Sequence, residues 1–310
     1  MFKLIMLTLV VVGSFHPCMA HSIPEFSPKE IQPSHVFGLV EYLERDVRDL
    51  AAKIGVPLRG NTVFYVENAE PREVYFQATS VRIKAFKLLN RFMDPDQSRF
   101  HKPSKITPYH VYGMVKQAQM DLRNYANAVG VMLGENKFEI AEGKTPSDVY
   151  NLLLRVNALL YSISPNSLTS RNIQLHLQSI IETLFAWNPL GPKSLVLSQR
   201  ASFGKYPKDI LLELVKAFSH TKAIAKRNNI KILDLRVLEN GSDTNAGHVY
   251  DLVRLLRSEI KHIYSVSGKH EEPDKYGVIP KYSFYSHNYS KVRAINLFLV
   301  SSIEGTKGKK

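Results

Sequence analysis

The stretch Pro33-Ser-His-Val-Phe-Gly-Leu-Val40 is repeated 75 residues later as Pro108-Tyr-His-Val-Tyr-Gly-Met-Val115. The alignment continues without a gap to residue 56 in the first copy and residue 131 in the second. At the same offset, Pro71-Arg-Glu-Val-Tyr75 matches Pro146-Ser-Asp-Val-Tyr150. Repetition at a fixed period indicates that one structural unit is used several times along the chain.

Each repeated opening has the features of a helix start. Proline is favoured at the first helical position, because its missing N–H would have no partner there and its φ angle is already helical. Weaker openings begin at Pro207 and Ala246. The third helical position is always histidine or an acid: His35, Glu73, His110, Asp148, Asp209 and His248. Such a side chain can accept a hydrogen bond from the backbone N–H of the N-cap residue, so we interpret the histidines as capping or surface residues.

Apolar residues recur behind each start at alternating steps of four and three. In the first helix they are Val36, Val40, Leu43, Val47, Leu50 and Ile54. This spacing predicts helices of about 20 residues whose apolar seams pack against nearly aligned neighbours.

The starts predict seven helices, and an apolar segment at 292–300 would supply the eighth, so the fold class is all-α. The seventh start is at Thr169. The first and second starts lie 38 residues apart, as do the third and fourth and the pair Thr169 and Pro207, which suggests a helical hairpin as the unit. We expect two antiparallel four-helix-bundle-like halves, with an α-solenoid of stacked hairpins as the alternative. Pro165 and Asn166 would end the fourth helix. The expected halves are residues 21–164 and 165–303, followed by a basic tail at 304–310.

The first residues have the pattern of an export signal. Lys3 precedes the apolar run 4–12, and small residues come before a cleavage site after Ala20. This run is shorter than the roughly 20 apolar residues that span a bilayer. We therefore expect residues 1–20 to be a cleaved signal peptide and the protein to be periplasmic or secreted. The alternative is a membrane-surface protein held by an uncleaved N-terminal segment.

The cysteine count and the net charge limit the classes of site and partner that this protein can have. The single cysteine is Cys18, so the chain after Ala20 has no thiol for disulfides or metal binding. The formal net charge is +13, and residues 189–240 contain 10 Lys and Arg against 4 Asp and Glu. A basic exported protein attracts acidic surfaces. The expected partner is an acidic protein or an anionic envelope polymer; nucleic acid is not expected, and membrane contact is at most peripheral.

The sequence shows no motif for catalysis. It has neither a Gly-x-Ser-x-Gly elbow nor a glycine-rich phosphate loop, so we expect no enzyme activity and no cofactor. A metal pair in a helical bundle requires two Glu-x-x-His motifs. Only Glu259 and His262 form one, and we interpret them as a solvated pair without metal. A cofactor- or metal-binding bundle is the second hypothesis for function.

Two sets of residues are candidate binding sites. The proline- and glycine-containing segment 188–206 interrupts the repeat within the basic region, and its candidates for partner contact are Arg200, Phe203 and Lys205. The second set is the aromatic residue that follows the first apolar position of a helix: Phe37, Tyr75, Tyr112, Tyr150 and Tyr250. These rings would either close the bundle ends by packing or form an aromatic platform for a ligand.

Export, helical repetition, positive charge and the missing catalytic motifs together favour one function. We expect an exported, non-enzymatic helical-repeat protein that acts as a binding or scaffold protein.

Overall fold

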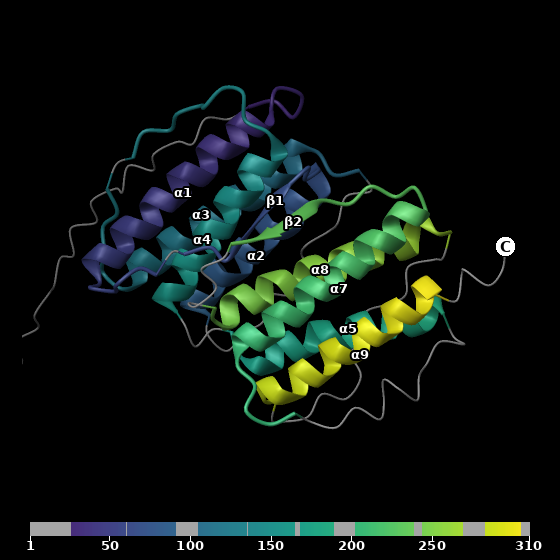
Figure 1. Cartoon of the computed structure of the whole chain (residues 1–310). Coiled ribbons are helices and arrows are strands. Elements are labelled where there is room, and N and C mark those ends of the chain that lie inside the picture. Colours follow the sequence, from purple (N-terminus) through teal and green to yellow (C-terminus); the bar gives the residue numbers. More distant parts are fainter. Residues whose placement is uncertain are drawn as a thin grey trace, which may run out of the picture.

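The computed structural model describes residues 26–59, 61–90, 105–134, 136–164, 168–188, 202–238, 244–268 and 283–304. Within these ranges the chain forms eight α-helices and one two-stranded sheet (Figure 1), so the predicted all-α class is confirmed. The helices are α1 Pro33–Lys53, α2 Pro71–Leu89, α3 Pro108–Ala128, α4 Pro146–Ile163, α5 Ser170–Trp187, α7 Pro207–Arg227, α8 Ala246–Val266 and α9 Tyr285–Glu304. No helix among the described residues is long and apolar enough to cross a membrane.

Seven helices begin where the sequence predicts, whereas α9 begins at Tyr285, before the predicted segment 292–300. The third helical residue contributes to these starts. In α1, α3 and α8 the histidine Nδ1 accepts a hydrogen bond from the N-cap N–H, at 3.2 Å for His35, 3.0 Å for His110 and 3.3 Å for His248. Glu73 and Asp148 accept the same bond in α2 and α4, at 2.7 and 2.8 Å. The capping interpretation of these residues is therefore confirmed.

The starts of the first four helices meet at one end of the molecule. Their first and fourth residues line a single apolar hollow, formed by Pro33, Val36, Pro71, Val74, Pro108, Val111, Pro146 and Val149. Helices α1 to α4 are therefore parallel. The prediction of antiparallel hairpins is wrong.

Parallel packing is possible because the connections between the helices are long enough to return along a whole helix. A helix of 21 residues such as α1 is about 31 Å long, and an extended chain covers that length in about ten residues. The segment between α3 and α4 runs back along α1. Its contacts are Lys53 Nζ to Met132 O at 2.6 Å, Arg45 Nη2 to Lys137 O at 2.8 Å, and Lys144 N to Ser34 Oγ at 3.3 Å.

The segment between α1 and α2 returns in the same way along α4. Its backbone N–H groups at Arg59, Val66 and Ala69 donate in turn to side chains near the end, the first half and the start of α4. Asn151 also donates back to the carbonyl of Val66 at 2.9 Å. Side chains of the helix thus hydrogen-bond the returning backbone.

The helices contact one another in two groups of the same pattern. Helices α1 and α2 each pack against α3 and α4, and α5 and α7 each pack against α8 and α9. We call these the first and second helix groups; Figure 1 shows them as the purple-to-teal and the teal-to-yellow parts of the molecule. The second group is parallel at α5, α7 and α9, because Asn288 donates to Ser170 O near two starts and Arg227 donates to Ile303 O near two ends.

A short antiparallel sheet, which the sequence analysis did not predict, joins the groups. Strand β1 (Phe64–Glu67) lies in the α1–α2 connection, and β2 (Asp234–Val237) lies in the α7–α8 connection. Phe64 pairs with Val237 and Glu67 pairs with Asp234. Two returning segments, one from each group, therefore meet edge to edge.

A substitution at Gly38 can test whether the α3–α4 connection returns along α1. A Cβ atom at Gly38 would overlap the carbonyl oxygen of Glu139 in the segment that returns along α1, whereas a Cβ at the repeat-equivalent Gly113 meets nothing within 4 Å. Alanine is normally favoured over glycine in a helix by about 1 kcal/mol. We predict that Gly38→Ala lowers the free energy of unfolding by about 1–3 kcal/mol through overpacking, measured by urea denaturation.

Gly113→Ala is the matched control, and it should leave stability unchanged or raise it by up to about 1 kcal/mol. Equal stabilisation by both substitutions would show that the segment does not pass against α1.

Candidate functional site

Exposed aromatic rings lie at the starts of α7 and α9, which a contact between Lys205 and Tyr289 links. Phe203 is 91% exposed, Tyr206 is 70% exposed and Phe284 is 63% exposed. Large apolar side chains are normally buried, and a group of them on the surface marks an interaction site more often than single ones do. We call Phe203, Lys205, Tyr206, Phe284 and Tyr289 the aromatic end.

Local structure fixes these residues in place. Gly204 has a φ of +70°, a left-handed turn that glycine adopts without strain, and it leads directly into α7. The backbone N–H of Tyr206 donates to Asp209 at 2.9 Å, which caps that helix. Lys205 Nζ lies 4.5 Å from the centroid of the Tyr289 ring, a cation–π contact that ties the α7 start to α9.

The aromatic end is basic as well as apolar. Lys208 is exposed in the first turn of α7, next to Lys205. The nearby carboxylate of Asp209 already accepts the capping hydrogen bond. Rings beside cations suit a partner that offers both apolar and acidic groups.

The structure brings two of the three predicted contact residues, Phe203 and Lys205, to this end. Arg200 lies outside the described residues. Sequence reasoning missed Phe284 and Tyr289, which come from a segment some 80 residues away in the chain. The available signal was their place at the start of the last apolar helix.

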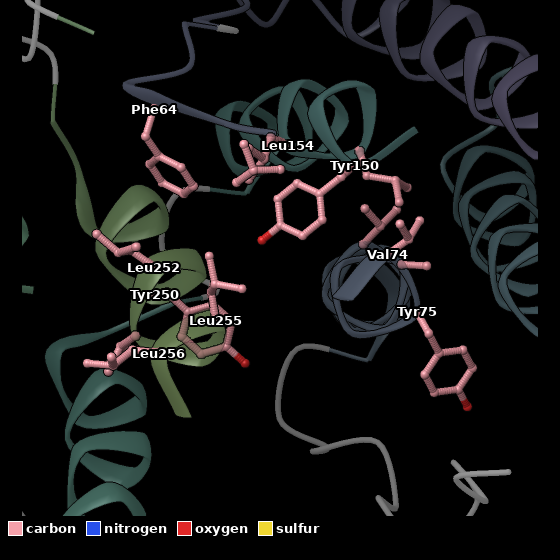
Figure 2. Packing of buried hydrophobic residues seen from close by; sticks show 14 of the residues in the cluster. Phe64, Val74, Tyr75, Tyr150, Leu154, Tyr250, Leu252, Leu255 and Leu256 are labelled. Carbon is pink, nitrogen blue, oxygen red and sulfur yellow. The ribbon is translucent and has the colours of Figure 1, made fainter. Parts of the chain in front are cut away.

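The recurring aromatic residues lie mostly inside the protein. Tyr75, Tyr112 and Tyr250 are each 5% exposed and Tyr150 is 1% exposed, and burial raises the pKa of Tyr112 to about 12. Figure 2 shows Tyr150 and Tyr250 near packed leucine side chains, whereas Tyr75 points away from them on a third helix. Phe37 is half-buried, with Lys144 Nζ 4.4 Å from its ring. This burial favours the packing interpretation, and the aromatic platform stays a prediction.

A second cluster, the charged seam, lies between the two groups, where α2 and α8 contact each other. Arg72 on α2 forms an ion pair with its neighbour Glu73 and contacts Glu259 on α8 at 2.9 Å. Further along, Lys84 Nζ donates to both carboxylate oxygens of Asp251, at 3.0 and 3.1 Å. The residue order shows that α2 and α8 are antiparallel.

Glu259 is fully buried, so its interpretation as a surface group paired with His262 is wrong. The reason is a tertiary contact with Arg72 that periodicity could not reveal. Burial raises the pKa of Glu259 to about 7, opposed by the Arg72 charge, and burial also raises the pKa of Glu73. Burial lowers the pKa of Lys84, against the attraction of Asp251.

Among the described residues, no three His, Cys, Asp or Glu side chains group as metal ligands. No protein-family model, curated protein or solved structure matches this chain. Its function must therefore be inferred from its own residues.

The charged seam predicts a pH dependence of stability. A carboxyl whose pKa rises from 4.5 to about 7 on folding binds its proton more tightly in the folded state. The contribution of this carboxyl to folding stability is complete at a pH below its pKa in the unfolded state. It is lost as the pH rises through its pKa in the folded state. We predict that the free energy of unfolding of the unsubstituted protein falls between about pH 5 and pH 8, and that in Glu259→Gln this fall is smaller by about 1–3 kcal/mol, because glutamine does not titrate. The measurement is the free energy of unfolding at each pH.

Glu142→Gln, at an exposed position outside the seam, is the control and should leave the pH profile unchanged. Parallel pH curves for Glu259→Gln and the unsubstituted protein would contradict the prediction.

Proposed function

We propose that this protein is an exported, non-enzymatic binding protein that holds an acidic partner protein at its aromatic end. One observation carries the proposal: three aromatic side chains are 63–91% exposed at the starts of α7 and α9, beside Lys205. Rings as exposed as these contribute little to the stability of the fold. Their exposure is consistent with a role in binding.

The chemistry of the end suggests how a partner would bind. Aromatic side chains are enriched among the residues that contribute most to protein interfaces, because they bury a large area at a small entropic cost. Lys205 and Lys208 would steer an acidic partner towards the rings. An anionic envelope polymer would use the cations without needing the rings.

We further propose that each helix group is a four-helix unit and that the two units form a rigid support for the aromatic end. Supporting this are the identical contact patterns of the groups and the sheet and charged seam that join them. Export rests on the N-terminal pattern of Lys3, an apolar run and Ala20. The proposed location is the periplasm or the extracellular medium.

Binding kinetics can distinguish the contribution of the cations at the aromatic end from that of the rings. We predict that Lys205→Glu slows association and reduces its salt dependence, because a rim charge acts mainly on the encounter. Phe203→Ser should instead speed dissociation about tenfold or more, as loss of a buried anchor does. The measurement is surface plasmon resonance against the protein captured from an envelope extract.

Matched controls lie elsewhere on the surface. Lys226→Glu reverses an exposed charge at the other end of α7, and Met132→Ser removes an 84% exposed apolar residue of the first helix group. Neither should alter binding, and all four variants should unfold within about 0.5 kcal/mol of the original protein. Loss of binding with Lys205→Glu but not with Phe203→Ser would favour an anionic polymer over a protein. Unchanged binding in both would overturn the proposal.

A further inference from the structure

Two buried carboxyl groups share one arginine where the first and second helix groups meet. Arg72 Nη2 donates to Glu259 on α8 at 2.9 Å and also pairs with Glu73, its neighbour on α2. Arg72 Nη1 donates to Ser258 Oγ at 3.2 Å. Glu259 is 0% exposed and Glu73 is 1% exposed. One guanidinium charge at the junction of the groups therefore faces two carboxyl groups that can each become negative.

The other charges closest to this pair do not neutralise the second carboxylate. The charges that act most strongly on Glu259 are those of Arg72, Glu73 and Glu70, and two of these three are negative. Glu70 itself pairs with Lys231 at the surface, at 3.2 Å. Full ionisation of the pair would thus place like charges together in a buried site, which is costly.

The rest of the charged seam is balanced by itself. Lys84 Nζ on α2 donates to both carboxylate oxygens of Asp251 on α8. On α4, Tyr150 faces Asp251 and Glu259, and burial raises the pKa of its hydroxyl well above the ordinary value, so the ring stays neutral. Arg254 on α8 acts on Lys84 and Tyr150. The imbalance is therefore at the Arg72 end of the seam.

One oxygen of Glu259 shows the imbalance directly. Its Oε1 is buried and has no hydrogen-bond partner among the described residues, whereas Glu73 accepts from Arg72 and, at 2.7 Å, from the backbone N–H of Glu70. A carboxylate in this position gains either by binding a proton or by reaching water. Burial accordingly raises the pKa of Glu259 to about 7, against the attraction of Arg72.

The position of the pair allows the contact at Arg72 to part while the two groups stay joined. Lys84 lies 12 residues beyond Arg72 on α2, which is about 18 Å along the helix, and its pair with Asp251 is a second link. The β1–β2 ladder is a third.

We propose that the charged seam is a pH-sensitive hinge between the two helix groups. While Glu73 and Glu259 hold one proton between them, α2 and α8 stay closed at Arg72; when both carboxyl groups are ionised, this end of the seam opens and Glu259 reaches water. The rigid support proposed for the aromatic end is then the closed, protonated form. The hinge does not depend on the binding role of that end.

The test is the labelling rate of a thiol placed inside the seam. A buried thiol reacts in proportion to the open fraction, even when that fraction is small. Ser258→Cys, in the full chain with Cys18→Ser, places the thiol beside Arg72 at a position that is 7% exposed. Dividing its rate by that of Ser265→Cys, at an exposed position of α8, corrects for ionisation of the thiol at each pH.

The corrected rate should rise about tenfold between pH 6 and pH 8.5, as linkage predicts for a carboxyl whose pKa is about 7 in the closed form and 4.5 in water. Glu259→Gln, added to Ser258→Cys, should remove most of this rise. Glu73→Gln should do the same, because Arg72 then faces a single carboxylate. Glu142→Gln, outside the seam, should keep the tenfold rise.

Two further cysteines separate opening of the hinge from unfolding. Ala126→Cys and Ala225→Cys lie in the cores of the first and second helix groups, each 1% exposed, and they react only when a group unfolds. At pH 8.5 the thiol of Ser258→Cys should react at least about tenfold faster than either. Equal rates at all three positions would show that the seam opens only by unfolding and would overturn the proposal. A corrected rate that does not rise with pH, or that rises equally in Glu259→Gln, would overturn it too.

Discussion

The fold depends on one geometric constraint: the helices of a group run in the same direction, so every connection must return along the full length of its group. The two returns that the structure describes, between α1 and α2 and between α3 and α4, place their backbone against a helix, and that backbone needs hydrogen-bond partners. The structure supplies them from helix side chains, as Arg45 does for the carbonyl of Lys137 and Asn151 does for both backbone groups of Val66. Gly38 leaves room for the segment that passes closest.

Parallel packing also has an electrostatic consequence. The positive ends of four helix dipoles meet beside the hollow formed by Pro33, Pro71, Pro108 and Pro146, and they repel one another. The acceptor at the third position of every start reduces this cost, because it occupies the N-cap N–H and, at Glu73 and Asp148, adds negative charge. The two groups then join through β1–β2 and through the ion pairs of α2 with α8.

The sequence predicted what local chemistry decides and missed what long-range contacts decide. Seven helix starts were correct because proline and the capping residue act within one turn, whereas α9, which has no such proline, begins earlier than predicted. The core positions followed from periodicity. The predicted helix direction was wrong because apolar residues have the same spacing along a helix whether it packs against a parallel or an antiparallel neighbour. The strand pairing of Phe64 with Val237 and the contact of Arg72 with Glu259 join residues more than 170 positions apart. Of the candidate site, Phe203 and Lys205 were found through the broken repeat, whereas Phe284 and Tyr289 needed the fold.

The most direct test of this account is a distance measurement by double electron–electron resonance on spin labels at the ends of α1 and α3, with Cys18 replaced by serine. Labels at Ser34 and Tyr109 mark two helix starts, and labels at Lys53 and Tyr109 mark an end and a start. For parallel neighbours about 10 Å apart, each rising 1.5 Å per residue, we predict that the first pair is closer by roughly 20 Å. A shorter distance between Lys53 and Tyr109 than between Ser34 and Tyr109 would contradict the parallel arrangement.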